Sequence, residues 1–244
     1  DSTAGLIPTS SDLDGITHVL STIPPTAEGH DPVLTHLGSQ LKERSLTWVG
    51  YLSTTGVYGD QQGRWVSEDD PANPGQPRSQ RRHACEQAWL DSGLPVQILR
   101  LPGIYGPGRS VLDSLRTGTA RRILKADQVF CRIHVDDIAG ACLHLMHQAT
   151  AGQWPAIVNV SDDCPAAPQD LLRYGAALLN CKLPDEEPFE LASRSMSAMA
   201  RSFWSENRRV RNTLLCQQLG YALLHPDFKA GLQDCLRQES QSCS

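Results

Sequence analysis

Three adjacent hydroxyl side chains, Ser53, Thr54 and Thr55, come at the end of an apolar segment that begins at Leu46. The segment reads L-T-W-V-G-Y-L-S, which is typical of a strand buried on both faces. Parallel sheets bind ligands in the crevice beyond the carboxyl ends of their strands, so the Thr54 hydroxyl is placed to polarise a ligand oxygen. The alternative is that the three hydroxyls only satisfy backbone groups in a turn.

Other chemistry-bearing residue types form no motif. The eight cysteines are widely spread without a C-x-x-C pair, and the eight histidines include no H-E-x-x-H or Cys/His set. His144 and His147 share a helix face, which we interpret as a solvated surface. We therefore expect no metal site, and mostly reduced, buried cysteines. The sequence has no G-x-S-x-G motif for a hydrolase or transferase nucleophile either.

Composition narrows the function classes. The 244 residues carry a formal net charge of −5, with 40% hydrophobic and 20% charged residues, which is ordinary for a globular domain. No basic stripe indicates a nucleic-acid surface, and no apolar run reaches the roughly 18 residues of a membrane span. The prediction is a soluble cytoplasmic protein, or a plastid protein if a transit peptide has been lost upstream.

The elements around the hydroxyls alternate between strand and helix. Residues 17–23, 46–53 and 96–101 read as buried strands, and residues 29–44 and 78–91 as helices between them. This alternation predicts an α/β fold with a doubly wound parallel sheet, in which the three strands are central neighbours. Residues 59–77, rich in Gly, Pro and Asp, are expected to form a long loop.

The second half is predicted to be mostly helical. We expect a strand at 130–135, a helix at 136–148 and a strand at 157–160, followed by helices at 168–179, 195–203, 212–219 and 227–236. No flexible linker separates the halves. We therefore expect residues 1–150 to form one domain and residues 151–244 to form a helical lobe packed on it.

Three motifs in this order resemble the extended short-chain dehydrogenases/reductases of the NAD-dependent epimerase/dehydratase type. They are L-S-T-T-G-V-Y-G at 52–59, L-R-L-P-G-I-Y-G-P-G at 99–108 and R-I-H-V-D-D at 132–137. Two later segments, N-V-S-D-D at 159–163 and S-E-N-R-R-V-R-N at 205–212, are similar to a bacterial and plastid-type branch of that family. Each motif is weak alone, since G-P-G is also turn chemistry and Asp136 or Asp137 can cap a helix. Their combination implies a Rossmann-like fold with a helical substrate lobe.

The resemblance also implies ligands and the residues that contact them. The cofactor is NAD or NADP, and its expected contacts are Ser21, Thr22, Pro24, Ser53, Thr54, Pro102, Gly103 and Ile104. The substrate is a small molecule, a sugar nucleotide or a ketone, and its expected contacts are Tyr58, Tyr105, Arg109 and His134. A homodimer is a candidate assembly.

The family's catalytic Tyr-x-x-x-Lys pair is absent. Alignment on Thr54 and Glu86 places Arg78 at the tyrosine position and Arg82 at the lysine position. An arginine stays protonated near neutral pH and cannot act as the acid/base. If the protein is an enzyme, Thr54 polarises the substrate and another group moves the proton, with His83 and His134 as candidates.

The glycine-rich turn of a dinucleotide-binding unit, G-x-G-x-x-G, does not occur in this sequence. The strand at 17–23 matches the family's fourth, so we expect that the N-terminal strands are missing through truncation. We also expect the chain by itself to bind either dinucleotide more weakly than about a millimolar dissociation constant.

Two functions follow from these observations. The first is NAD(P)-dependent oxidoreductase or epimerase/dehydratase chemistry with an atypical active site. The alternative is a non-catalytic nucleotide sensor or scaffold on the same fold, favoured by the missing tyrosine and lysine. Dinucleotide titration followed by a turnover assay separates the two.

Overall fold

A four-stranded parallel sheet forms the centre of the molecule. The computed structural model describes residues 7–150, 152 and 154–242. The sheet contains β1 (His18–Ser21), β2 (Trp48–Thr54), β4 (Val96–Leu101) and β8 (Ile157–Asn159), in the order β1-β2-β4-β8. All three pairings are parallel, so the prediction of a parallel α/β sheet with three neighbouring strands is confirmed.

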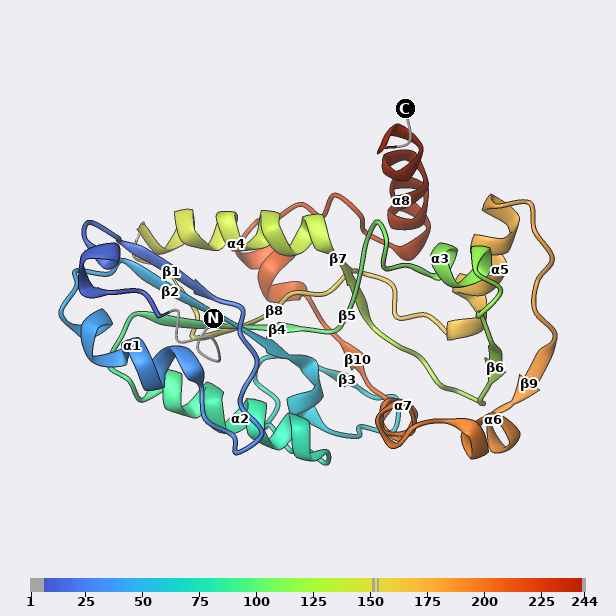
Figure 1. Cartoon of the computed structure of the whole chain (residues 1–244), viewed down its shortest axis with the longest axis horizontal. Coiled ribbons are helices and arrows are strands. Elements are labelled where there is room, and N and C mark those ends of the chain that lie inside the picture. The colour runs from blue at the N-terminus through green and yellow to red at the C-terminus, as the bar shows by residue number, and fades with distance from the viewer. Residues whose placement is uncertain (1–6, 151, 153, 243–244) are drawn as a thin grey trace.

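Helices cover both faces of this sheet. Helices α1 (Pro32–Lys42) and α2 (Pro77–Leu90) lie against one face and α4 (Val135–Thr150) against the other, as Figure 1 shows. Along β2, Val49 and Tyr51 pack with Trp89 of α2, whereas Trp48 belongs to the core cluster beneath α4. Because side chains alternate along a strand and both faces are buried, the continuous apolar pattern of β2 is explained.

A glycine in β2 makes room for a tryptophan. A Cβ at Gly50 would lie 2.1 Å from the ring of Trp48, two residues earlier on the same face. The Trp48 Nε1–H donates to Gln97 Oε1 at 2.9 Å, which satisfies the buried indole inside the core.

The start of α1 is fixed by Asp31. Its Oδ1 accepts from Leu34 N at 2.9 Å, and Pro32 occupies the first helical turn. Its Oδ2 accepts from Trp89 Nε1 at 2.9 Å. The helix therefore begins later than the predicted residue 29.

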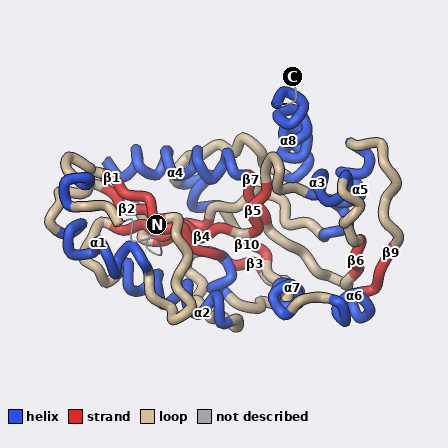
Figure 2. The backbone as a smooth tube through the Cα atoms, in the orientation of Figure 1, coloured by secondary structure: helices blue, strands red, loops and turns tan. Residues whose placement is uncertain are grey.

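Beyond the sheet lies a lobe of short elements, visible to the right in Figure 2. Its helices are α3 (Val111–Arg116), α5 (Pro168–Leu178), α6 (Phe189–Ser195), α7 (Ala198–Trp204) and α8 (Phe228–Ser242). Three two-stranded parallel ladders accompany them: β5 (Gly103–Tyr105) with β7 (Arg132–His134), β3 (Trp65–Val66) with β10 (Arg209–Val210), and β6 (Arg122–Leu124) with β9 (Glu186–Pro188). Short 3₁₀ turns lie at η2 (Ser10–Leu13) and η3 (Thr55–Tyr58).

Several local predictions for this half were wrong. The expected helix at 195–203 is α7, which begins only at Ala198 because Met196 before it has an extended backbone, and the preceding helix α6 was not predicted. The expected helix at 212–219 is one π-helical turn, η4 (Leu214–Gln218). The expected loop at 59–77 contains β3, whose partner β10 lies far away in the sequence. The sheet takes β8 from beyond residue 150, and the lobe takes α3 and β6 from before it.

Other bulk expectations concern cysteines and membranes. Cys85, Cys131, Cys142 and Cys235 are buried free thiols, and Cys243 lies outside the described residues. Within the described part of the chain, every helix is too short or too polar to cross a lipid bilayer.

Candidate functional site

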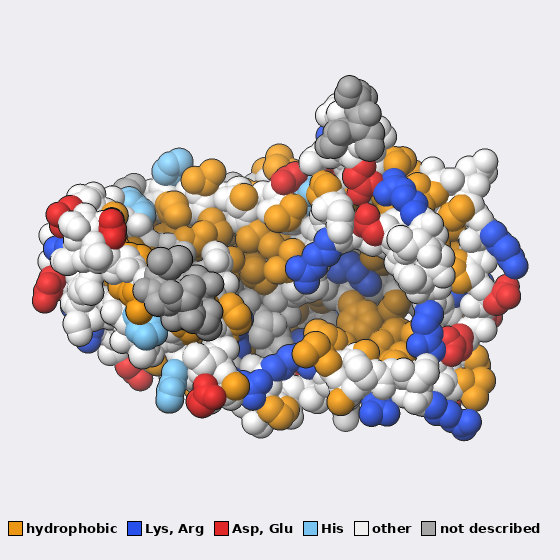
Figure 3. All heavy atoms as spheres, in the orientation of Figure 1, with side chains coloured by type: hydrophobic (Ala, Val, Ile, Leu, Met, Phe, Trp, Pro, Cys, Tyr) orange, Lys and Arg blue, Asp and Glu red, His pale blue; other side chains and the backbone are white. Residues whose placement is uncertain are grey.

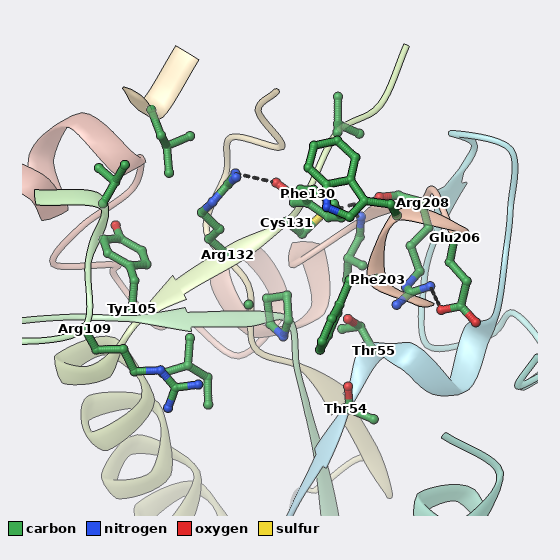
Figure 4. A pocket seen from close by; sticks show the side chains of 18 of the residues that line it. Thr54, Thr55, Tyr105, Arg109, Phe130, Cys131, Arg132, Phe203, Glu206 and Arg208 are labelled. Atoms are coloured by element: carbon green, nitrogen blue, oxygen red, sulfur yellow. Dashed lines mark hydrogen bonds and ion pairs between the residues drawn. The ribbon is translucent and has the colours of Figure 1, made fainter. Parts of the chain in front are cut away.

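A cavity of about 420 Å³ opens where β2 and β4 end, between the sheet and the lobe. It is the hollow near the centre of Figure 3, and Figure 4 shows its walls. The side chains and backbone that line it belong to Thr54, Thr55, Arg78, Pro102, Gly103, Ile104, Tyr105, Arg109, Ser110, Val111, Val129, Phe130, Cys131, Arg132, Leu171, Phe203, Trp204, Glu206, Arg208, Val210 and Leu232. Thr54 and Ile104, both named from the sequence as cofactor contacts, thus line the same cavity at the carboxyl edge of the sheet.

Thr54 accepts a backbone hydrogen bond at the edge of the cavity. It caps the 3₁₀ turn after β2, and its Oγ1 accepts from Gly56 N at 3.1 Å. The turn role of Thr54 is therefore present, and Thr54 also lines the cavity, where its hydroxyl group can still donate a hydrogen bond.

Ser53 points to the other side of the strand. Its Oγ donates to Glu86 Oε1 at 2.5 Å. The fully buried Glu86 also receives two bonds from Arg100, Nε to Oε1 at 3.1 Å and Nη2 to Oε2 at 2.8 Å. Ser53 therefore belongs to a buried ion-pair network, and the structure does not bring it into the cavity.

Arg78 and Arg82 lie one turn apart on α2 but have different surroundings. Arg78 lines the cavity, with its guanidinium 4.1 Å from the Phe203 ring centroid and a hydrogen bond to Ser202 Oγ. Burial lowers the pKa of Arg78 from its usual value, although Glu206 nearby opposes this. Arg82 lies outside the cavity lining, where its Nη1 donates to Tyr51 Oη at 2.9 Å and to the Leu52 carbonyl at 3.2 Å. Arg82 thus ties α2 to the end of β2.

The segment after β4 forms the second wall. Residues 102–105 line the cavity as β5, which pairs in parallel with β7. Burial raises the pKa of Tyr105, and its Oη lies 3.5 Å from the Asp227 carbonyl, so the phenol stays protonated. Arg109 is exposed at the cavity, in an ion pair with no described residue.

Five predicted contact residues lie elsewhere. Tyr58 is fully buried and donates to Asn159 Oδ1 at 2.9 Å. Ser21 is buried at the end of β1, and its Oγ has no hydrogen-bond partner. Thr22 and Pro24 are exposed in the loop that follows. The fifth, His134, is fully buried. None of these five residues lines the cavity.

His134 belongs to a separate polar cluster with Asp136, His225 and Asp234, whose ligand atoms lie within 4.8 Å of one another. Such a set could hold a metal ion. However, the amide of Gln238 already donates to both Asp136 Oδ2, at 3.2 Å, and Asp234 Oδ2, at 2.7 Å. The carboxylates are satisfied by the protein itself, and we assign no metal to them. His83, the other candidate for proton transfer, lies beside Glu86, with its Nδ1 3.4 Å from Oε2.

The sequence did not predict that residues 129–132 and 203–210 line the cavity; together they form the part of its wall that we call the roof. Glu206 is 6% exposed; its Oε2 pairs with Arg208 at 2.8 Å, and its buried Oε1 has no partner. The S-E-N-R-R-V-R-N segment was noticed as a similarity, but nothing local indicated that it faces Thr54. Cys131 also lines the cavity, and burial raises its pKa to about 11, so it is a neutral thiol.

Comparisons with known proteins bear on this geometry. Residues 33–161 match the model of the NAD dependent epimerase/dehydratase family. A structure of a functionally unknown conserved protein from Silicibacter pomeroyi has 44% sequence identity and a TM-score of 0.87, covering 96% of this chain and 81% of that one.

Two more distant relatives extend the comparison. Protein YeeZ of Escherichia coli K12 is 28% identical over 179 residues, which is 72% of this chain but only 58% of YeeZ. The dTDP-glucose 4,6-dehydratase of Bacillus anthracis, solved in complex with NAD, has 16% identity and a TM-score of 0.71, covering 93% of this chain and 73% of that one. At that identity the likeness shows the fold alone.

Proposed function

The chain belongs to the NAD-dependent epimerase/dehydratase family, and from that membership we propose that it takes part in NAD(P)-dependent oxidation or reduction of a small molecule. The observation that carries the proposal is the cavity itself. It joins a hydroxyl at the end of one parallel strand, Thr54, to the backbone that follows the next, 102–104. This is the crevice where α/β sheets bind their ligands.

The residues present fit the nicotinamide half of the cofactor. Gly103 is exposed in the cavity, so its backbone can be approached closely. When bound, the cofactor would supply or accept the hydride.

The chain's own groups would orient the substrate and move its proton. Thr54 donates its hydroxyl proton to the substrate oxygen, and Arg78 stabilises negative charge there without exchanging a proton. Glu206 is the carboxylate among the residues that line the cavity. We therefore assign it the role of accepting the proton when a substrate hydroxyl is oxidised.

Saturation-transfer NMR with NADP⁺ and NAD⁺ tests the proposal, because it detects millimolar binding. Protein saturation should reach the nicotinamide protons more strongly than the adenine protons. A Gly103→Leu variant, which adds a side chain inside the cavity, should abolish the nicotinamide signal. Thr119→Val on the exposed lobe surface should leave it unchanged. Equal transfer to both rings, or stronger transfer to adenine, would contradict the proposed site.

A turnover assay completes the test. Ketones, including phosphorylated ones, and sugar nucleotides are offered with reduced and oxidised cofactor, and the absorbance of the nicotinamide is followed. Glu206→Gln should lower the rate, while nicotinamide saturation persists. Nicotinamide binding without turnover on either class would instead favour a nucleotide-sensing role.

A further inference from the structure

The positive charges around the cavity are not balanced by the protein. Four arginines line it: Arg78, Arg109, Arg132 and Arg208. Glu206 is the single carboxylate among the lining residues, and it pairs with Arg208 at 2.8 Å. The other three guanidinium groups form no ion pair with a described residue. About three cationic charges therefore face a space without a counter-ion.

Arg132 is the most enclosed of these unpaired cations. Its Nη1 donates to the carbonyls of Phe130 at 2.8 Å and Ala166 at 3.1 Å, so the guanidinium is held by backbone rather than by a carboxylate. Burial lowers the pKa of Arg132. A guanidinium that is desolvated, held in place and without a counter-ion raises the free energy of the folded protein unless a ligand anion binds it.

The nearest protein carboxyl does not provide that anion. Asp162 is 1% exposed, and its Oδ2 has no hydrogen-bond partner. Burial raises the pKa of Asp162 to about 8, although the Cys164 backbone N–H and the charge of Arg132 oppose the rise, and this favours the neutral carboxyl. It makes no direct bond to the Arg132 guanidinium in the described hydrogen-bond network.

The size of the cavity limits the ligand. Its volume of about 420 Å³ lies at the low end of the roughly 300–1,000 Å³ typical of small-molecule sites. On the proposed function, part of this volume holds the nicotinamide ring. The remainder suits a sugar-sized compound better than a whole nucleotide sugar.

We propose, on the basis of the function proposed above, that the substrate is a compact phosphomonoester whose phosphate binds Arg132 and Arg109. A phosphate group carries about −1.5 to −2 charges at neutral pH, which matches the unpaired arginines better than a single carboxylate does. In Figure 4, Arg109, Tyr105 and Arg132 lie in the left half of the view and Thr54 in the right half, with the Arg132 guanidinium directed toward the Phe130 carbonyl. The phosphate thus binds at one end while the reacting carbon faces Thr54.

Calorimetric titration with charge-matched probes tests this assignment. Glucose 6-phosphate and inorganic phosphate should bind and compete with each other, whereas glucose should not bind. Arg132→Met should weaken the binding of glucose 6-phosphate at least tenfold, and Arg109→Met should weaken it about threefold to tenfold. Arg173→Met, which removes an exposed arginine on α5 outside the cavity, should have no effect.

Each contrary result overturns a stated part. Gluconate binding as tightly as glucose 6-phosphate would overturn the phosphate assignment, and UDP-glucose binding tenfold more tightly would overturn the compact substrate. Equal weakening by Arg173→Met would overturn the location. If Arg132→Met does not fold, Arg109→Met decides, because it changes an exposed side chain.

The result is separable from the proposed function. Nicotinamide saturation in the NMR experiment, with no phosphate binding, would remove only this inference. Phosphate binding lost in Arg132→Met, without nicotinamide saturation in the parent chain, would remove the oxidoreductase proposal instead.

Discussion

Two arginines of this protein, the buried Arg100 and the half-buried Arg132, differ in their counter-ions. Arg100 in β4 meets Glu86 through two hydrogen bonds, and Ser53 adds a third to the same carboxylate. Arg132 in β7 meets only backbone carbonyls. The protein supplies the counter-ion of Arg100, whereas on our proposal a ligand anion supplies that of Arg132. The comparison teaches that a charge without a counter-ion can mark a site when no catalytic motif does.

The largest effect is expected from breaking the compensated pair. Glu86→Leu should lower the free energy of unfolding by about 3–5 kcal/mol, because it leaves Arg100 charged and unpaired in the core. Urea unfolding measures the loss. The double variant Glu86→Leu, Arg100→Met should lose much less stability. An equal or larger loss would show that the unpaired charge of Arg100 does not cause the destabilisation.

The next effect separates two neighbours on β2. Ser53→Ala should cost about 1.5–3 kcal/mol of stability, because it removes a hydrogen bond to a buried charge. Thr54→Ala should lower the free energy of unfolding by less than about 1 kcal/mol, because it removes only the capping hydrogen bond from Gly56 N. Urea unfolding of both variants tests the difference, and equal losses would contradict the assignment of Ser53 to structure and Thr54 to the site.

Asp162, near Arg132, should make the stability of the protein depend on pH. Its pKa of about 8 in the folded protein lies above the ordinary 3.8, so the folded state holds a proton that the unfolded chain has already lost. Stability from this group is therefore present at low pH and is lost as the pH rises from about 4 to about 8. Asp162→Asn should remove that slope, on the order of 1–3 kcal/mol. Unfolding curves between pH 5 and 8 measure it, and an unchanged slope would contradict the protonated carboxyl.

The smallest stability effect is expected at Arg132. Arg132→Met should change the free energy of unfolding by less than about 1 kcal/mol, because losing two bonds to carbonyls is offset by removing an unpaired, half-buried charge. Thermal unfolding of the ligand-free protein measures this. A loss as large as that of Glu86→Leu would mean that Arg132 is structural, which would end the comparison.

Periodicity explains why the sheet could be predicted from the sequence. Residues 46–53 and 96–101 are apolar on both faces, and a buried parallel strand requires this locally. The ends of the same strands located Thr54 and residues 102–104, because strand ends define the crevice. These parts of the candidate site depend on short-range information.

The roof of the cavity could not be predicted in the same way. Glu206, Arg208 and Arg132 reach the cavity through pairings with segments far away in sequence, and no local pattern encodes such contacts. The four arginines of the cavity are far apart in the sequence, and their clustering exists only in the folded chain. Likewise His134 matched a motif position, yet its side chain is enclosed beside α8.

The short ladder between β3 and β10 has a consequence for the order in which the protein is made. It joins residues 65–66 to residues 209–210, which leave the ribosome only after more than half of the chain has been added between them. Nearly all of the sheet can form while synthesis continues, because its strands lie within the first 159 residues. Contacts of such long range form late, since closing the long loop costs entropy before any contact is gained. A chain released before residues 203–210 are made would have the sheet without those residues of the cavity lining, so ligand binding requires that they have been synthesised.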